Sequence, residues 1–324
     1  MLIAGILIKL DSFHKQLLPV DVAVEYTIEA GSSAHRHIAW LQDQQLIEST
    51  FWAKLWLRSQ PEMARIKAGH YEILPGTSLS QHFEKMVAGQ EKQYYLTLVE
   101  GLTFAQWLGQ LKQTPNLEFD IGSTASIFQQ VLQHNPYCDN PKRSVEGCLL
   151  PDTYAFRMAT PASEIIKRAA QAMYSKVSEL WPLRALDLPY DSPYEALIMA
   201  SIVEKETGVA AERGVIAGVF VNRLNKNMRL QTDPTVIYGI GPTFDGNLTR
   251  VHLRTKTPYN TYTIKGLPPT PIAMPSTAAL RASVQPETTD YYYFVARGDG
   301  SHQFSTNLAD HNKAVRRYQL KRND

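Results

Sequence analysis

The 324-residue sequence contains few cysteines and none of the usual zinc-binding patterns. It has two cysteines, Cys138 and Cys148, and no Cys-x-x-Cys pair, which argues against a structural zinc site. The two cysteines lie ten positions apart in a segment that reads as a loop. They could form a disulfide in an oxidising compartment, or they could remain free thiols.

The sequence also lacks the short motifs that mark several large enzyme classes. There is no HExxH, no GxSxG, no P-loop and no GxGxxG, which together argue against zincins, α/β-hydrolases, NTPases and dinucleotide-binding enzymes. His302 has no neighbouring residue at metal-ligand spacing. We therefore expect neither a metal nor a cofactor.

No block of like charge and no long hydrophobic run is present. The net charge is +2 and the basic residues are scattered, so the sequence shows no cluster of basic residues of the kind that binds nucleic acid. The apolar start, MLIAGILI, stops at Ile8, whereas a spanning helix needs about 20 apolar residues. Residues 1–22 are interpreted as a leading strand, which the sequence slightly favours, or as the stub of an N-terminal anchor.

The length and a hydrophobic content of 44% are typical of a two-domain globular protein. Alternation predicts a strand at 24–28, and two amphipathic helices and a strand–turn–strand at 64–74 follow, giving a small βααβ module over 23–90. Residues 91–143 are interpreted as a connecting region, and 144–324 as a larger domain of helices and short strands. The predicted fold class is α+β.

A predicted helix over 193–207 contains the segment ASIVEKETG, residues 200–208. Ser192, Pro193 and Glu195 form a capping-box pattern, and Gly208 is a suitable residue just past the end. An almost wholly apolar run therefore leads into two glutamates, Glu204 and Glu206.

Helical phase distinguishes these two glutamates. At about 100° per residue, Glu206 falls on the side that carries Ile198 and Ile202, while Glu204 points away towards solvent or a polar neighbour. A carboxyl on the apolar side is partly desolvated, which raises its pKa and suits it to act as a general acid. The alternative is that Glu206 is structural and pairs with Arg213 or Arg229.

The segment MRLQTDPTVIYG, residues 228–239, is the next candidate region. A short strand is expected at 228–231. Asp233 before Pro234 is interpreted as a helix N-cap, with a second carboxylate facing Glu206 as the alternative. Gln231 and Thr232 could hydrogen-bond a polar substrate or close the turn.

A long proline-rich loop covers residues 257–276. Tyr259 and Tyr262 offer flat faces, and Asn260 and Thr261 offer hydrogen-bonding groups, as in a groove for a sugar or a peptide. The alternative is a surface loop that packs on its own side chains.

Taken together, these motifs resemble the YceG-like (MltG) family of endolytic murein lytic transglycosylases. The resemblance is carried by PDTY (151–154), ASIVEKET (200–207), VFVNRL (219–224), MRLQTDPTVIYG (228–239), YNTY (259–262), GLPPTPIAMPS (266–276) and YYYFVARGDGSHQFSTNLADHN (291–312). The motifs occur in family order across about 145–315. A much looser resemblance relates residues 23–90 to a LysM-like module.

The resemblance implies that Glu206 is the catalytic residue and that the substrate is the glycan strand of peptidoglycan. It implies cleavage of the MurNAc–GlcNAc β-1,4 bond to 1,6-anhydro-MurNAc ends, without a cofactor, as a step that ends strand elongation. It also implies a single-pass anchor in the bacterial inner membrane, a periplasmic catalytic domain and contacts with peptidoglycan synthases. The alternatives are a non-catalytic peptidoglycan-binding scaffold and a two-carboxylate muramidase.

Overall fold

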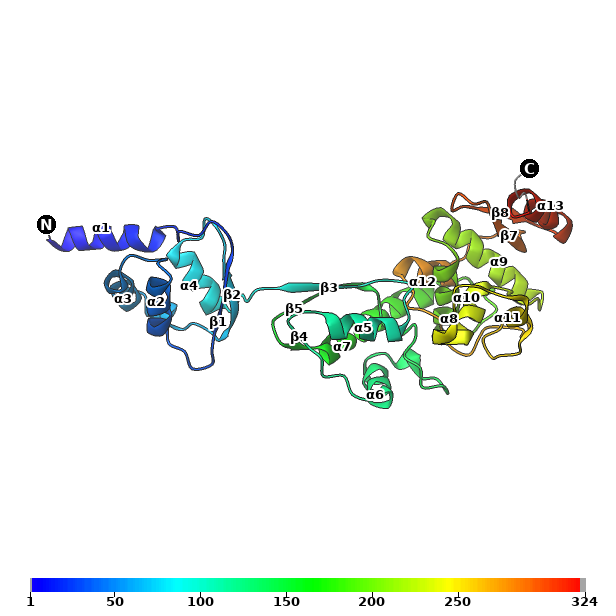
Figure 1. Ribbon diagram of the computed structural model, residues 1–324, viewed down its shortest axis with the longest axis horizontal. Coiled ribbons are helices and arrows are strands. Elements are labelled where there is room, and N and C mark those ends of the chain that lie inside the picture. The colour runs from blue at the N-terminus through cyan, green and yellow to red at the C-terminus, as the bar shows by residue number, and fades with distance from the viewer. Residues whose placement is uncertain (1, 321–324) are drawn as a thin grey trace. The chain divides into compact units, whose positions relative to one another are not determined.

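The computed structural model describes residues 2–320, which form two compact units (Figure 1). The first unit comprises the residues up to Tyr95 together with Ala155–Thr160, and the second comprises Leu96–Tyr154 and the residues from Pro161 onward. The segment expected to connect two domains, 91–143, thus belongs to the second unit from Leu96 on. Both units combine helices with short strands, which confirms the α+β class.

The first unit is built on an antiparallel pair of strands and four helices. Val24 of β1 lies opposite Ile73 of β2, and Ile28 lies opposite Gly69. The elements are α1 (Leu2–Lys15), β1 (Val24–Ile28), α2 (Ala34–Asp43), α3 (Thr50–Ser59), β2 (Gly69–Ile73) and α4 (Leu79–Ala88). The expected βααβ order is present, but residues 64–74 hold one strand and not the two that were predicted.

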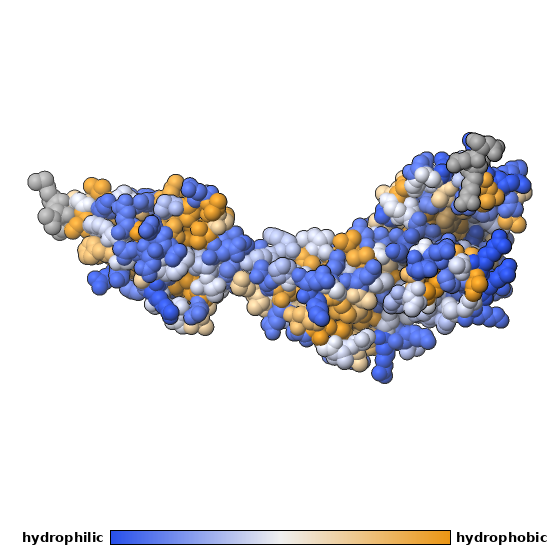
Figure 2. All heavy atoms as spheres, in the orientation of Figure 1, coloured by the Kyte–Doolittle hydropathy of each residue, from blue (hydrophilic) through white to orange (hydrophobic). Residues whose placement is uncertain are grey.

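The leading segment is helix α1, so the strand expected there is wrong. The helix continues beyond Ile8 to Lys15, and α1 contacts α3 and α4. Phe13 of this helix is buried in the core of the first unit. Ile6, Leu7 and Ile8 remain exposed, and Figure 2 shows hydrophobic residues at this end of the unit. Among the helices that the structure describes, none is both long enough and apolar enough to cross a membrane.

The second unit contains nine α-helices within its described residues. Its helices are α5 (Phe104–Gln113), α6 (Thr124–His134), α7 (Ala162–Leu180), α8 (Pro193–Glu206), α9 (Arg213–Asn225), α10 (Asp233–Ile240), α11 (Arg250–Arg254), α12 (Thr277–Val284) and α13 (Leu308–Tyr318). The strands pair as β3 (Tyr94–Leu98) with β5 (Asp152–Phe156), β4 (Leu117–Glu118) with β6 (Thr160–Pro161), and β7 (Tyr293–Ala296) with β8 (His302–Ser305). Residues 228–231 form a loop, so the strand predicted there is wrong.

Helix α8 is largely buried in the second unit, and Figure 1 shows it beside α10 and α12. Its start is the predicted capping box, in which the Ser192 hydroxyl accepts from the Glu195 amide and the Glu195 carboxylate accepts from the Ser192 amide. Every residue from Ala196 to Val203 is buried, because α9, α10 and α12 pack around it. The middle of the helix is therefore buried on all sides, and its C-terminal residue Glu206 lines a cavity.

A disulfide joins Cys138 and Cys148, with 5.9 Å between the two Cα atoms. Both cysteines are fully buried. The bridge follows helix α6 and ties the loop after it to the segment that leads into β5. Of the two alternatives left open by the sequence, the structure adopts the disulfide.

Candidate active site

A cavity of about 500 Å³ lies at the C-terminal end of α8. Glu206 lines it from α8 and Arg223 from α9, the loop before α10 contributes Gln231 and Thr232, and α10 contributes its first residue, Asp233. The β7–β8 hairpin and α13 complete the wall. The volume is typical of a small-ligand site in proteins.

Glu206 is the partly buried acid of this cavity. Burial raises the pKa of Glu206 to about 7. The hydrogen bond that the Thr232 hydroxyl donates to Oε1 of Glu206 has the opposite effect and lowers this pKa. The nearby charge of Asp233 also raises this pKa, whereas the positive charge of His302, when protonated, and of Arg223 lowers it. Within residues 2–320 Glu206 forms no ion pair, so the considered pairing with Arg213 or Arg229 is not present. A carboxyl in this state can hold a proton near neutral pH and give it up.

Glu204 has a structural role and is not among the residues that line the cavity. Its carboxylate accepts hydrogen bonds from the backbone amide of Ser276, at 2.9 Å, and from the Ser276 hydroxyl. Ser276 is the N-cap of α12, so Glu204 joins the end of α8 to the start of α12. The helical phase predicted that Glu204 faces either solvent or a polar neighbour, and the structure shows that this neighbour is Ser276.

The loop before α10 brings Thr232 and Asp233 to the cavity wall. Thr232 is the N-cap of α10 and Asp233 is its first residue, so the interpretation of Asp233 as the N-cap is wrong by one position. Asp233 Oδ1 instead accepts a hydrogen bond of 2.6 Å from the hydroxyl of Tyr262, which also lines the cavity. Gln231 adopts a φ of 52° and is exposed at the same wall.

The other three residues of the proline-rich loop support the site without lining it. Asn260 is fully buried and donates to the carbonyls of His252, Leu253 and Thr255. Thr261 is also buried, and its hydroxyl accepts from the Thr232 amide at 3.1 Å. The Tyr259 hydroxyl shares a 2.9 Å hydrogen bond with Thr270. Of these three side chains, which were expected to contact substrate, Thr261 holds the Thr232 backbone, while Asn260 and Tyr259 bond to other parts of the loop region.

Arg223 is a site residue that the sequence analysis did not identify. It is 7% exposed, and its guanidinium donates to the carbonyls of Tyr292, Leu230 and Arg229. These bonds join α9 to the loop before α10 and to β7. The buried cation also favours the ionised form of Glu206, which is the form that remains after a proton has been donated.

His302 is a second site residue whose role the sequence did not reveal. It lines the cavity from β8, and its Nδ1 lies 2.7 Å from Oε2 of Glu212. Oε1 of the same carboxylate accepts from the His302 backbone amide at 2.9 Å. The two residues are 90 positions apart, so no local motif could have paired them.

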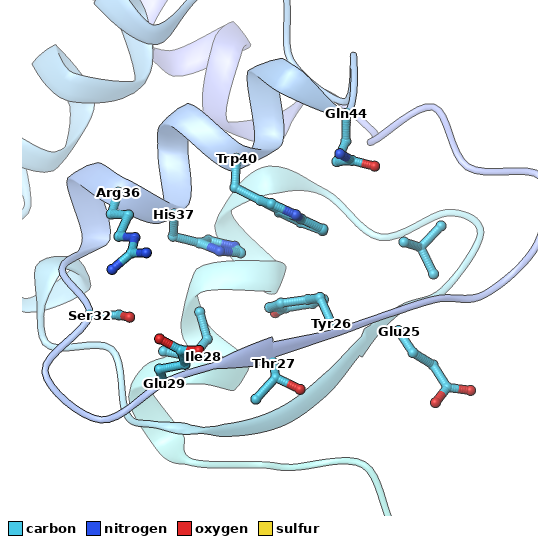
Figure 3. Close-up of a pocket in the computed structure, with 11 residues that line it drawn as sticks. Glu25, Tyr26, Thr27, Ile28, Glu29, Ser32, Arg36, His37, Trp40 and Gln44 are labelled. Atoms are coloured by element: carbon cyan, nitrogen blue, oxygen red, sulfur yellow. The ribbon is translucent and has the colours of Figure 1, made fainter.

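A cavity of about 490 Å³ in the first unit offers different chemistry (Figure 3). His37 and Trp40 project from α2 towards Tyr26 on β1, and the three rings pack on one another at 4.9 to 5.2 Å. Hydrogen bonds from Lys92 and His70 lower the pKa of Glu25, at its edge, to about 2. The Glu25 carboxyl is therefore ionised near neutral pH, unlike that of Glu206.

No group of three or more His, Cys, Asp or Glu side chains within the described part of the chain could hold a metal ion. The candidate active site is therefore a constellation of protein acids, hydroxyls and one buried cation around Glu206.

The chain belongs to the YceG-like family, whose model matches residues 26–317. A crystal structure of a putative YceG-like protein from Listeria monocytogenes superimposes with a TM-score of 0.59 at 30% identity, covering 90% of this chain and 98% of that one.

Two curated relatives are named endolytic murein transglycosylase. The relative from Bacillus subtilis (strain 168) is 30% identical, over 96% of this chain and 91% of its own. The relative from Streptococcus pneumoniae (strain D39) is 28% identical over 92% of this chain, which spans 60% of that protein.

Proposed function

We propose that this protein is an endolytic murein transglycosylase, a lyase that cleaves the β-1,4 bond between N-acetylmuramic acid and N-acetylglucosamine. The observation that carries the proposal is the Glu206 carboxyl, whose pKa burial raises to about 7 at the wall of a cavity large enough for a sugar. Family membership and the names of the relatives support the choice of substrate.

The proposed reaction needs one carboxyl. Glu206 gives its proton to the glycosidic oxygen as the bond from that oxygen to C1 of the muramyl ring breaks. The 6-hydroxyl oxygen of the same ring bonds to C1, and its proton passes to the Glu206 carboxylate. No water is consumed, the product carries a 1,6-anhydro end, and the acid is restored.

The environment of Glu206 suits both halves of this cycle. Burial favours the protonated form that starts the reaction, while the Thr232 hydroxyl and the charge of Arg223 stabilise the carboxylate that follows. Opposing effects of this kind bring a carboxyl towards the pH at which it can both donate and accept a proton.

The test is Glu206→Gln, which keeps the shape of the side chain and removes the titrating proton. We expect wild-type protein to produce anhydro ends from purified glycan strands, read by mass spectrometry, and the variant to lose about a hundredfold or more in rate. Glu204→Gln, on the same helix but outside the cavity, is the matched control and should retain the activity. Undiminished activity of Glu206→Gln would exclude the proposal.

A two-carboxylate hydrolase is the second candidate, because Asp233 lines the same cavity. Such an enzyme would use Asp233 to activate water and would leave reducing ends. Reducing, non-anhydro ends from the wild-type protein, together with a loss of activity in Asp233→Asn, would identify the hydrolase.

We further propose that the enzyme acts on nascent strands outside the cytoplasm, anchored in the inner membrane and close to peptidoglycan synthases, and that it ends strand elongation. The disulfide between Cys138 and Cys148 supports an oxidising compartment such as the periplasm. Glycan strands that become longer when the gene is deleted, and that return to normal length with the wild-type gene but not with Glu206→Gln, would be the expected result.

A further inference from the structure

The pair formed by Glu212 and His302 fixes one ring of the active-site wall in a single orientation. Glu212 lies in the short turn between α8 and α9, and its two carboxylate oxygens accept from the backbone amide and from Nδ1 of His302. Both side chains are nearly buried, with 11% of His302 and 14% of Glu212 exposed. The ring also meets Phe294 edge-on, at 5.4 Å between centroids.

In the neutral form of the imidazole, this geometry determines which nitrogen carries the proton. Because a carboxylate can only accept, Nδ1 holds the hydrogen and Nε2 presents a lone pair. Within residues 2–320, Nε2 has no hydrogen-bond partner, and the ring borders the cavity that Glu206 also lines. In this form, Nε2 of His302 is a hydrogen-bond acceptor that is held in place at the cavity wall and can accept from a donor on the substrate.

We infer that His302 Nε2 accepts a hydrogen bond from the acetamide N–H of the muramyl ring whose C1 is attacked, and that Glu212 orients the imidazole for this contact. The inference rests on the proposed function. It makes His302 a substrate-binding residue and Glu212 a positioning residue, with Glu206 still moving the proton.

The chemistry of the muramyl ring selects the acetamide as the donor. Inside a glycan strand, O1 and O4 of this ring are in glycosidic bonds and O3 carries the lactyl ether, so none of them has a hydrogen to donate. The 6-hydroxyl is the nucleophile, and its proton passes to Glu206 in the proposed reaction. The acetamide N–H is the remaining donor on the ring, and it lies on C2, next to the reacting C1.

Two substitutions of His302 separate binding from folding. In His302→Asn, the amide nitrogen can take the place of Nδ1 and keep the bond to Glu212, but no atom replaces Nε2. In His302→Gln, the longer side chain can bring an amide oxygen to the position of Nε2. We expect both variants to melt close to the wild-type temperature.

The activities of the two variants should differ. The loss of one hydrogen bond predicts a kcat/KM about tenfold below wild type for His302→Asn, mostly through KM, with partial recovery in His302→Gln. Glu212→Ala, which frees the ring, should also raise KM. The exposed His35 of α2 provides the matched control, because His35→Gln should keep wild-type kinetics.

Equal kcat/KM in wild type and His302→Asn would overturn the inference, and so would equal losses in the Asn and Gln variants. These outcomes leave the proposed function intact as long as the wild-type protein forms anhydro ends. If the wild-type protein formed no anhydro ends, the proposed function itself would be refuted. A structure of the Glu206→Gln protein with a bound glycan oligomer should place the acetamide nitrogen within about 3.2 Å of His302 Nε2. Another sugar atom at that position would also overturn the inference.

Discussion

Replacing Thr232 with valine should make the enzyme more active at alkaline pH relative to its activity at neutral pH. The Thr232 hydroxyl donates a hydrogen bond to Oε1 of Glu206, and this bond lowers the pKa of a carboxyl that burial otherwise raises. Valine has nearly the same shape and no donor. The carboxylate loses its stabilising partner, so the pKa of Glu206 should rise above about 7.

The size of the effect follows from the strength of such a bond. A hydrogen bond to a charged group contributes about 1.5 kcal/mol or more, and one pKa unit corresponds to about 1.4 kcal/mol. We therefore expect the pKa of Glu206 to rise by about one unit. At pH 8 the protonated fraction would increase about fivefold.

The assay is kcat/KM for the formation of anhydro ends, measured from pH 5 to 9. A general acid works in its protonated form, so activity should fall as the pH rises through the pKa of Glu206, about 7 in the wild-type protein. The midpoint of this fall should move upward in Thr232→Val and stay near its wild-type position in Thr232→Ser, which keeps the hydroxyl. A midpoint that stays in place or moves downward in Thr232→Val would refute the reasoning.

The remaining predictions concern charge, pH and the disulfide. Asp233→Asn removes a negative charge that raises the pKa of Glu206, so it should move the same midpoint downward, opposite to Thr232→Val. The pKa of Glu206 is about 7 in the folded protein and about 4.5 for an ordinary glutamate, so ionisation of Glu206 destabilises the fold as the pH rises. Glu206→Gln should therefore stabilise the protein at pH 8 by up to about 3 kcal/mol and by little at pH 4.5, as urea titrations would show. Burial lowers the pKa of His37 to about 4, so stability of the first unit should fall by about 3 kcal/mol as pH drops from 6.5 to 4, and tryptophan fluorescence should show less loss in His37→Gln. Replacing both Cys138 and Cys148 with serine should cost about 3 kcal/mol, and a reducing agent should then have no further effect on the melting temperature.

Local signals in the sequence predicted the helix ends well. The capping box at Ser192 and the end of α8 just before Gly208 lie where the sequence placed them. These features depend on residues within one turn of each other, so a sequence contains all the information they need. The helix at α1 was missed because the apolar run was considered only to Ile8, whereas Phe13 contributes to the same buried face.

Pairings between distant segments could not be predicted in the same way. Glu212 and His302 are 90 positions apart, and Glu204 and Ser276 are 72 apart, so no spacing rule relates them. The buried Arg223 could not be predicted because its partners are backbone carbonyls, which every residue has and which no sequence motif identifies. Asn260 and Thr261 have side chains that suit a ligand, and the fold uses them to hold the loop.

The sequence by itself determined that a capped, apolar helix ends near Thr207, next to Glu206, and that Glu206 differs in phase from Glu204. It could not determine why the difference matters, because α8 is buried on all sides and phase alone does not single out a catalytic face. Only the tertiary structure decided this, by placing Ser276 against Glu204 and a cavity with Thr232 against Glu206. The physical reason is that a carboxyl's pKa depends on desolvation and on its partners, and packing between distant segments supplies both.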